Sequence, residues 1–345
     1  MALFDLTDFD NHEQVVFCSD KDSGLKAIIA IHNTKLGAAV GGCRLWDYEN
    51  DEDALVDVLR LSKGMTYKNA LAGLKMGGGK SVIIGDPKKI KSEQLFKAFG
   101  QALERLNGRY LSAEDVNITT HDIAIANSVT RFVTGTEGKS GNPAPFTALG
   151  TFLGIKASVK HKFNQDNLTN ITVAVQGLGS VGYQVCDYLN KAGAKLIVTD
   201  INQISLKNAA KEFDAKIVDL DEIYDQDVDV YAPCALGATI NDNTLKRLKA
   251  VIVAGCANNQ LAEAHHDQAL FDQGILYAPD YVINAGGIIN VSFEDDYDIK
   301  KSTQKVEEIY HTLLNIFKLS ANKHIPTGII ADNMAREIIR KGVEK

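Results

Sequence analysis

The sequence has few of the features that mark secreted, membrane-spanning or nucleic-acid-binding proteins. It holds only five cysteines in 345 residues, without a C-x-x-C pair, so we expect neither a disulfide framework nor a metal site. No apolar run approaches the ~20 residues that a membrane-spanning helix needs. The first ten residues carry three aspartates and no basic residue, which is unlike a signal peptide. We therefore expect a cytoplasmic protein.

Basic charge is also scarce. Lysine and arginine number 37 against 44 acidic residues, which gives a net charge of −7. A protein that holds nucleic acid or an anionic membrane by charge needs a basic stripe, and none is visible in this sequence. We therefore predict no nucleic-acid partner and no membrane partner.

The composition is that of a globular protein, with 45% hydrophobic and 23% charged residues. At roughly 150 residues per domain, the length predicts two domains. The 28 glycines, against six prolines, indicate tight turns or ligand sites lined by backbone. Strand and helix patterns alternate on both sides of a polar, glycine-rich segment at 138–141, which predicts an α/β fold with a domain boundary there.

Apolar patterns predict the individual elements. In the first part of the chain, strands are expected at 15–18, 26–31, 81–84 and 109–111, and helices at 54–72 and 92–106. The cluster Gly77–Gly79 is expected to stop the first of these helices. After the boundary we expect a helix at 145–162 and strands at 171–176, 196–200, 228–231, 251–253 and 275–277. Two helices end the chain, the second from about residue 328.

One glycine motif stands in the setting of a dinucleotide site. Gly177, Gly179 and Gly182 form G-x-G-x-x-G between a predicted strand and a predicted helix, and Asp200 lies 23 residues after Gly177, at the end of the next strand. The helix N-terminus would favour the pyrophosphate. Asp200 would accept hydrogen bonds from the adenosine ribose and repel a 2′-phosphate, and the neighbouring Ile201 offers no cation. The motif therefore predicts NAD as cofactor.

Gly79-Lys80-Ser81 looks like the end of the phosphate-binding loop of an ATPase. That loop needs a glycine six residues before the lysine, where this chain has Leu74, so we reject the ATPase interpretation. Lys80 and Lys68 both lie in apolar, glycine-rich surroundings. A lysine there is costly unless it binds an anion or loses its proton, or unless its ammonium group reaches solvent. Both lysines are candidate site residues.

Several short segments together resemble one family, the amino-acid dehydrogenases of the glutamate/leucine/phenylalanine/valine type. The resemblance covers nearly the whole chain, and the nearest members are the leucine dehydrogenases, followed by the tryptophan- and phenylalanine-specific enzymes. The segments that carry it occur in family order and are Gly41-Gly42-Cys43-Arg44, Met65-Thr66-Tyr67-Lys68-Asn69-Ala70, Gly77-Gly78-Gly79-Lys80, Ala113-Glu114-Asp115-Val116, Val175-Gln176-Gly177-Leu178-Gly179, Ala232-Pro233-Cys234-Ala235, Ala257-Asn258-Asn259-Gln260 and Asn284-Ala285-Gly286-Gly287.

The resemblance implies an N-terminal α/β substrate-binding and catalytic domain over residues 1–137, onto which 326–345 fold back. It implies a C-terminal Rossmann domain that binds NAD over residues 138–325. The implied reaction is the reversible oxidative deamination of an L-amino acid to a 2-oxo acid and ammonia. The implied assembly is a homo-oligomer, from dimer to octamer.

The resemblance also implies roles for individual residues. Lys80 is the general base that activates water, Asp115 assists proton transfer beside it, and Lys68 binds the substrate carboxylate. Further substrate contacts are implied at Gly41, Gly42, Met65 and Asn284. Thr147 and Asn258 are implied to lie near the nicotinamide. Contacts to the rest of the dinucleotide are implied at Gly177, Leu178, Gly179, Ser180, Val181, Gly182, Asp200, Ile201 and Ala235.

Four positions bear on the choice of substrate. Glutamate dehydrogenases use a lysine and a serine to hold the second carboxylate of glutamate, where this chain has Val40 and Val291. A carboxylate buried there would lack a partner, so an apolar substrate is favoured. Ala113 resembles the leucine-type enzymes, and Ile288 is intermediate between the leucine and aromatic types. We therefore favour leucine, isoleucine and valine.

Two alternatives stay open at this point. The chain could prefer phenylalanine or tryptophan, because differences of one methylene in such a pocket are worth only ~1–3 kcal/mol. It could also be an NAD-binding sensor without turnover. The presence of Lys68, Lys80 and Asp115 speaks against the sensor.

Overall fold

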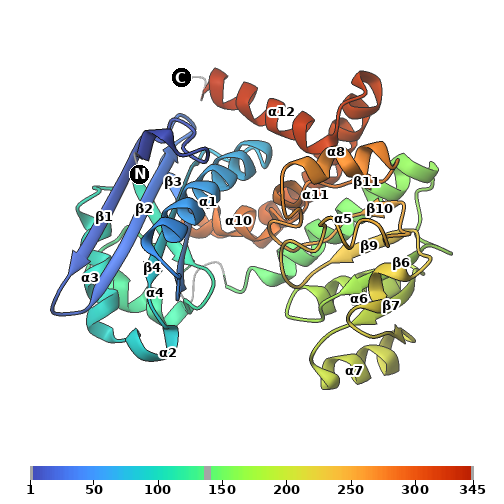
Figure 1. The fold of residues 1–345 in the computed structure, drawn as a ribbon, viewed down its shortest axis with the longest axis horizontal. Coiled ribbons are helices and arrows are strands. Elements are labelled where there is room, and N and C mark those ends of the chain that lie inside the picture. The colour runs from blue at the N-terminus through green and yellow to red at the C-terminus, as the bar shows by residue number, and fades with distance from the viewer. Residues whose placement is uncertain (1–2, 136–140, 343–345) are drawn as a thin grey trace. The chain divides into compact units, whose positions relative to one another are not determined.

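The computed structural model describes residues 3–135 and 141–342, and the chain forms two compact units (Figure 1). The first unit comprises Met1–Gly141, Val291–Tyr297 and Ala335–Lys345. The second comprises Asn142–Asn290 and Asp298–Met334. The glycine-rich boundary predicted at 138–141 lies, except for Gly141, outside the described residues.

The first unit is built on a five-stranded sheet in the order β1-β2-β4-β3-β5. Its strands are β1 (Gln14–Asp20), β2 (Leu25–Asn33), β3 (Ala39–Trp46), β4 (Gly77–Ile84) and β5 (Tyr110–Glu114). Pairs β1–β2 and β2–β4 are antiparallel, whereas β3 runs parallel to β4 and to β5. The helices of this unit are η1 (Leu3–Asp5), α1 (Asp51–Leu71), α2 (Pro87–Ile90), α3 (Glu93–Glu104), α4 (Thr120–Asn127) and η3 (Glu294–Asp296).

Helices cover both faces of this sheet, which explains the unbroken apolar run in β2. Because successive side chains of a strand point to opposite faces, Ile28 and Ala30 pack in one cluster with Val58 of α1. Ile29 packs in a second cluster with Phe96 of α3. A strand buried on both faces reads as a continuous hydrophobic segment rather than an alternating one.

The glycine cluster of β4 corrects one sequence-based prediction. Gly77–Gly79 lie inside the strand, and α1 ends earlier, at Leu71, with Gly73 in a left-handed conformation (φ +66°) just after it. The glycines are needed because neighbours pack directly on the strand backbone. A Cβ atom at Gly78 would lie 2.1 Å from the backbone nitrogen of Thr66. Strand β3, which is also rich in glycine, was not predicted.

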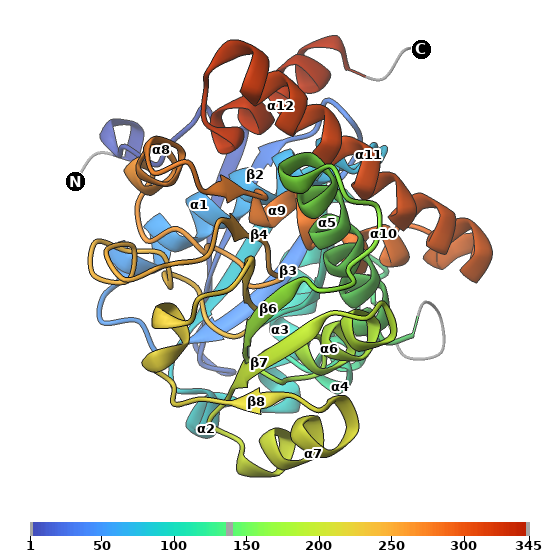
Figure 2. The same cartoon turned by 90° about the vertical axis from the view of Figure 1, so that its right-hand side faces the viewer.

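The second unit holds a six-stranded parallel sheet in the order β11-β10-β9-β6-β7-β8 (Figure 2). Its strands are β6 (Thr172–Gln176), β7 (Lys195–Thr199), β8 (Lys216–Ile217), β9 (Val230–Pro233), β10 (Ile252–Val253) and β11 (Leu276–Tyr277). This is the doubly wound order of dinucleotide-binding domains, in which ligands bind where the order reverses, here between β6 and β9. The predicted α/β class with a Rossmann domain is confirmed.

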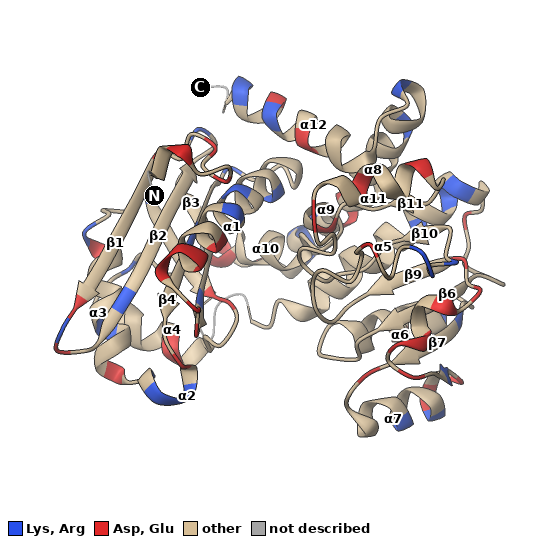
Figure 3. Cartoon of the chain, in the orientation of Figure 1, with Lys and Arg blue, Asp and Glu red and all other residues tan. Residues whose placement is uncertain are grey.

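Helices connect these strands and complete the unit. They are α5 (Ala144–Phe163), α6 (Gly182–Lys191), α7 (Gln203–Phe213), η2 (Glu222–Asp225), α8 (His265–Asp272), α9 (Asp280–Ile283) and α11 (Ile299–Lys323). Two further helices, α10 (Gly286–Val291) and α12 (Thr327–Lys341), begin in this unit and end in segments that belong to the first. Basic and acidic residues alternate along α12 (Figure 3). Within residues 3–135 and 141–342, none of the helices combines the length and the apolar character that crossing a bilayer requires.

Candidate active site

A buried ion pair lies at the centre of the first unit. Lys80 of β4 is only 5% exposed, and its Nζ lies 2.8 Å from Oδ2 of Asp115, which follows β5. Strand β3 runs between β4 and β5 in the sheet, so the ion pair spans that strand. Burying an ammonium group carries a desolvation cost that the pairing must offset. Ionisable groups held in this way are typical of functional sites.

Two glycines of β3 make room for the pair. A Cβ atom at Gly42 would lie 2.8 Å from Cβ of Asp115, and one at Gly41 would lie 1.9 Å from the carbonyl oxygen of Gly79. The hydroxyl of Tyr110 donates a hydrogen bond of 2.7 Å to the carbonyl oxygen of Gly41. The predicted site residues Gly41 and Gly42 are therefore required by packing, whatever they contact in a ligand.

Arg44, for which the sequence indicated no role, contacts the same carboxylate. Its Nε lies 3.5 Å from Oδ2 of Asp115, and its Nη1 lies 2.9 Å from Oδ2 of Asp57. The hydroxyl of Tyr48 donates to the same Asp57 oxygen at 2.6 Å. Cations and carboxylates thus alternate in the order Lys80, Asp115, Arg44 and Asp57.

The two neighbouring cations determine the charge of Asp115. Burial alone would raise the pKa of Asp115, but the neighbouring cations Lys80 and Arg44 lower it below its usual range. Asp115 is therefore ionised at neutral pH. One signal could have revealed Arg44: it follows Gly42 by two residues, and residues two apart in a strand share one face of the sheet.

The predicted substrate-binding residues of the first unit come from α1, β3, β5 and the segment that begins at Val291. Met65 of α1 packs against β3, since a Cβ atom at Gly41 would lie 3.2 Å from its Cγ. Lys68 lies three residues further along α1, next to Met65 on the helix surface, and is half-buried. In β5, Ala113 pairs with Gly42, and Val40 is buried in β3. Val291 also belongs to this unit.

In the second unit, the glycine motif forms the turn between β6 and α6. Gly177 has φ +102°, and a Cβ atom there would lie 2.6 Å from Cβ of Ala235, which follows β9. A Cβ at Gly182 would lie 2.0 Å from the carbonyl oxygen of Gly177. Gly179, by contrast, is exposed and has nothing within 4 Å of its Cβ position. Two glycines thus serve packing, and the third leaves the backbone open to a ligand.

The remaining predicted cofactor residues lie in or beside this turn. Ser180 and Val181 precede α6, which begins at Gly182. Asp200, just after β7, accepts hydrogen bonds from the backbone N–H groups of Leu178 and Asn202. The carboxylate thereby links the end of β7 to the glycine turn, and Ile201 beside it is exposed.

A second cluster in this unit joins Asn284, which follows α9, to the loop after β10. The side-chain nitrogen of Asn284 donates to Oδ1 of Asn258 at 2.7 Å and to the carbonyl oxygen of Cys256 at 3.1 Å. Its Oδ1 is buried and has no hydrogen-bond partner within the described ranges 3–135 and 141–342. Thr147 of α5 lies against the start of α10, since a Cβ at Gly287 would lie 2.9 Å from its Oγ1. The cluster offers a free acceptor to a ligand.

Comparison with known proteins agrees with this geometry. The model of the Glu/Leu/Phe/Val dehydrogenase dimerisation domain matches residues 12–134, and that of the glutamate/leucine/phenylalanine/valine dehydrogenases matches residues 198–329. The chain is 53% identical to leucine dehydrogenase of Bacillus subtilis (strain 168), over 99% of this chain and 95% of that protein. It is 47% identical to phenylalanine dehydrogenase of Lysinibacillus sphaericus, over 95% of this chain and 89% of that protein.

A solved structure is similar as well. The crystal structure of L-tryptophan dehydrogenase from Nostoc punctiforme matches with a TM-score of 0.85 and 46% identity, covering 96% of each chain. The fold and the site thus define an oxidoreductase that acts on CH–NH₂ groups. The chain belongs to the Glu/Leu/Phe/Val dehydrogenase family and is an amino-acid dehydrogenase. The predicted family and the predicted reaction class, oxidative deamination of an apolar amino acid, are confirmed.

Proposed function

We propose that this enzyme catalyses the NAD-dependent, reversible oxidative deamination of L-leucine, L-isoleucine and L-valine. In the forward direction, the amino acid, NAD⁺ and water give the 2-oxo acid, ammonium, NADH and a proton. The observation that carries the proposal is the buried Lys80–Asp115 ion pair, in a chain that also has an open glycine turn at the end of β6. The similarity to leucine dehydrogenases supports the choice of branched-chain substrates.

The residues of the glycine turn fit NAD. Gly179 leaves backbone accessible at the N-terminus of α6, where a pyrophosphate is favoured. Asp200 offers carboxylate oxygens to ribose hydroxyls and would repel the 2′-phosphate of NADP, so NAD is preferred. When bound, the cofactor supplies the acceptor for the hydride that leaves the substrate Cα. Thr147, Asn258 and Asn284 would hold its nicotinamide end.

Binding of the amino acid would use charges and backbone from the first unit. We assign the substrate carboxylate to the ammonium group of Lys68 and to the backbone of Gly41 and Gly42, with Met65 beside them. The free Oδ1 of Asn284 would accept a hydrogen bond from an N–H group of the substrate or cofactor, which removes an otherwise unsatisfied buried acceptor.

The proton chemistry is assigned to Lys80 and Asp115. After the substrate has lost its hydride, it is an imine with an electrophilic carbon. Lys80, in its uncharged form, takes a proton from water as the water oxygen bonds to that carbon. Asp115, 2.8 Å from Lys80 Nζ, then helps to pass this proton from Lys80 to the substrate nitrogen. The C–N bond breaks, ammonia leaves, and the hydroxyl group gives its proton back to Lys80 as the carbonyl of the 2-oxo acid forms.

The side-chain pocket is assigned to four apolar residues: Val40, Ala113, Ile288 and Val291. No member of this set can pair with the distal carboxylate of glutamate, so glutamate is expected to be a poor substrate. The aromatic substrates of the 47% identical relatives are the alternative to the branched-chain ones.

We further propose that the enzyme works in the cytoplasm as a homo-oligomer. All five cysteines are free thiols, which is typical of a reducing compartment. The match of residues 12–134 to a dimerisation domain supports self-association.

A panel of kcat/KM values for NADH formation tests the substrate. The wild type should deaminate leucine, isoleucine or valine faster than phenylalanine at equal subsaturating concentration, and glutamate slowest. Ala113→Gly should shift the ratio toward phenylalanine by up to ~10–200-fold, the range for small volume changes in an apolar pocket. Preference of the wild type for phenylalanine or tryptophan would refute the branched-chain assignment. Binding of NAD without turnover of any amino acid would establish the sensor instead.

A further inference from the structure

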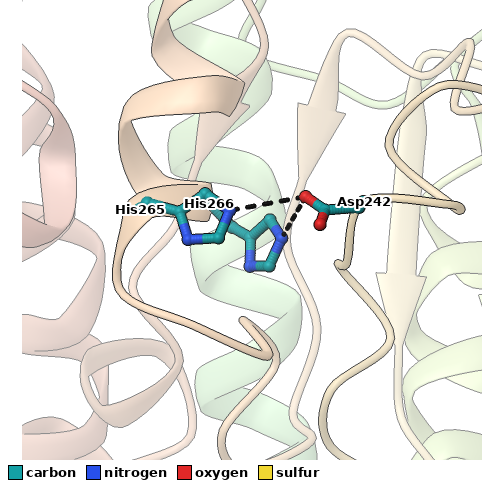
Figure 4. Close-up of side chains that lie close together, drawn as sticks. All are labelled: Asp242, His265 and His266. Atoms are coloured by element: carbon teal, nitrogen blue, oxygen red, sulfur yellow. Dashed lines mark hydrogen bonds and ion pairs between the residues drawn. The ribbon is translucent and has the colours of Figure 1, made fainter.

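A second group of chemically active side chains lies in the Rossmann unit, and none of its members belongs to the site described above. Asp242, His265 and His266 point toward one another (Figure 4). Oδ1 of Asp242 lies 3.4 Å from Nε2 of His265 and 3.2 Å from Nε2 of His266. One potential ligand atom from each residue lies within 4.8 Å of the others.

Two of the three separations match a tetrahedral metal site. Ligand atoms that are each about 2.0–2.1 Å from a tetrahedral zinc ion lie about 3.3 Å from one another. The two distances from the Asp242 oxygen are 3.4 Å and 3.2 Å. The third pair of ligand atoms, one from each histidine, lies within 4.8 Å, so a small approach of the two rings would enclose an ion.

The fold holds both ligand-bearing segments in place. Asp242 lies in a turn in which Oδ1 of Asn241 accepts hydrogen bonds from the backbone N–H groups of Asn243 and Thr244. Just before this turn, Ile240 forms a parallel bridge with Leu261, close to the start of α8. His265 and His266 are the first two residues of α8. Such pre-organisation lowers the entropic cost of binding an ion.

A single residue orients both imidazole rings. Nδ1 of His266 lies 3.2 Å from the carbonyl oxygen of Glu263, and Nδ1 of His265 lies 3.3 Å from the Glu263 carboxylate. In metal sites, a ligating histidine almost always donates its other N–H to a carbonyl or carboxylate oxygen. Glu263 offers such an acceptor to each ring and leaves both Nε2 atoms free to ligate.

Without an ion, the three side chains have another way to satisfy their hydrogen bonds. The backbone N–H of Glu263 donates to Nδ1 of His266 at 3.0 Å, which places the ring proton on Nε2, facing Asp242. Ion binding would select the other tautomer, in which Nδ1–H donates to the Glu263 carbonyl oxygen. This exchange gives up the hydrogen bond donated by the Glu263 N–H and so lowers the affinity for the ion.

Exposure gives the site an entry path. His266 is only 2% exposed and so has a fixed ring, whereas His265 and Asp242 are exposed to solvent. An ion can therefore enter from water and keep water in its fourth position. Two imidazoles and one carboxylate suit zinc and its neighbours nickel and copper, and do not suit magnesium or calcium, which take oxygen ligands.

We propose that Asp242, His265 and His266 form a binding site for a divalent transition-metal ion of the zinc type. The ion would link the turn at Asp242 to the start of α8 and stabilise the Rossmann unit. This role is independent of the chemistry assigned to Lys80 and Asp115.

Calorimetric titration of metal-free, tag-free protein with ZnCl₂ tests the proposal. The wild type should bind one ion saturably. His265→Gln and Asp242→Asn should each weaken binding by at least ~10-fold, since each removes one of three ligands. Both positions are exposed, so the variants should keep the circular dichroism of the wild type. His311→Gln, at an exposed histidine of α11, is the matched control and should bind as the wild type does.

Two further measurements separate this site from the cysteines. Bound Co²⁺ should give only the visible bands of nitrogen and oxygen ligation, without the intense near-ultraviolet band of a thiolate ligand. Zinc should raise the Tm of the wild type and of His311→Gln but not of Asp242→Asn. The proposal is overturned if the wild type shows no saturable binding, if both ligand variants bind like the wild type, or if a thiolate band appears.

Discussion

Lys80 is the residue on which the chemistry depends most directly. Its ammonium group is nearly inaccessible and pairs with the carboxylate of Asp115, for which Gly42 of the neighbouring strand leaves room. It lies in a different unit from the glycine turn assigned to NAD. A change at this lysine should therefore affect the chemical step and leave cofactor binding nearly unchanged.

Lys80→Ala should lower kcat by ~10²–10⁴-fold, the usual contribution of a positioned acid–base group, and leave the Kd for NAD close to that of the wild type. Steady-state kinetics measure kcat, and fluorescence titration with NADH measures the affinity of the cofactor site. Lys89→Ala is the matched control, because Lys89 is an exposed lysine in α2 of the same unit. A Lys80→Ala enzyme with normal turnover would remove the lysine from the mechanism.

Arg44 should act through Asp115. Arg44→Gln removes one of the two cations that lower the pKa of Asp115, so this pKa should rise. If ionised Asp115 is needed for turnover, activity is lost as the pH falls through that pKa, and the acidic limb of the kcat/KM profile should move to higher pH. Arg44→Lys, which keeps the positive charge, should restore most of the profile. A loss of activity that is equal at every pH would point to a structural role only.

The sequence predicted the local glycine motif better than the contacts that join residues far apart in the chain. The spacing of Gly177, Gly179 and Gly182 is local, because it reports a turn made by six consecutive residues. The contact of Lys80 with Asp115 joins two strands that are far apart in the chain, and only the family resemblance indicated it. Arg44 was missed for the same reason: its partner Asp57 lies on α1, and nothing in the sequence near Arg44 identifies that contact.

Among the secondary-structure elements, glycine-rich strands were the hardest to predict. Glycine normally weakens a strand, so a pattern-based prediction places β3 and the start of β4 in loops. Tertiary packing overrides this preference, because Gly78 and Gly79 lie so close to Thr66 and Tyr110 that no side chain fits. Five strands of the Rossmann sheet were predicted with only small shifts in their ends, because apolar, β-branched runs mark buried parallel strands. The sixth, β8, has only two residues, both exposed, and was not predicted.

The contact between α8 and α12 has a pH dependence that can be worked out. Asp267 of α8 accepts hydrogen bonds from the backbone N–H groups of Gly328 and Ile329, at the start of α12. Burial raises the pKa of Asp267 to about 6, from an ordinary value of 3.8. Between these two values the folded chain binds more protons than the unfolded chain. The contribution of Asp267 to stability therefore falls as the pH rises through this window, and stays low above it.

Asp267→Asn removes this titration but keeps an oxygen for only one of the two N–H groups, because Gly328 donates to Oδ1 and Ile329 to Oδ2. Loss of that hydrogen bond lowers the stability of the variant at every pH, so the titration shows in the pH dependence: the free energy of unfolding of the variant relative to the wild type should be ~1 kcal/mol more favourable at pH 7.5 than at pH 5. Thermal unfolding at the two pH values measures the difference. Asp272→Asn, at an exposed aspartate of the same helix, should show no such pH dependence. A stability difference between Asp267→Asn and the wild type that is equal at the two pH values would contradict the assignment.

For the molecule as a whole, strand β1 is the exposed edge of the first sheet. It pairs with β2 on one side only and presents Phe17, which is 63% exposed. An edge with free backbone groups and an exposed ring invites pairing with another chain. The edge lies within the residues that match a dimerisation domain.

Phe17→Lys should therefore weaken self-association, because it places a charge on that edge. Light scattering over a dilution series should show smaller assemblies for this variant than for the wild type at the same concentration. Phe163→Lys is the control, at an α5 residue that is 40% exposed in the other unit. Equal masses for the wild type and Phe17→Lys at every dilution would exclude β1 from the interface.

The division of the chain into units has a consequence for protein engineering. The chain passes between the units four times, because the first unit takes three separate segments and the second takes two. A cut at Gly141 would deprive the N-terminal fragment of Val291–Tyr297 and Ala335–Lys345. Neither half is therefore a transplantable module, and a chimaera that borrows the cofactor unit of a relative must exchange Asn142–Asn290 and Asp298–Met334 together.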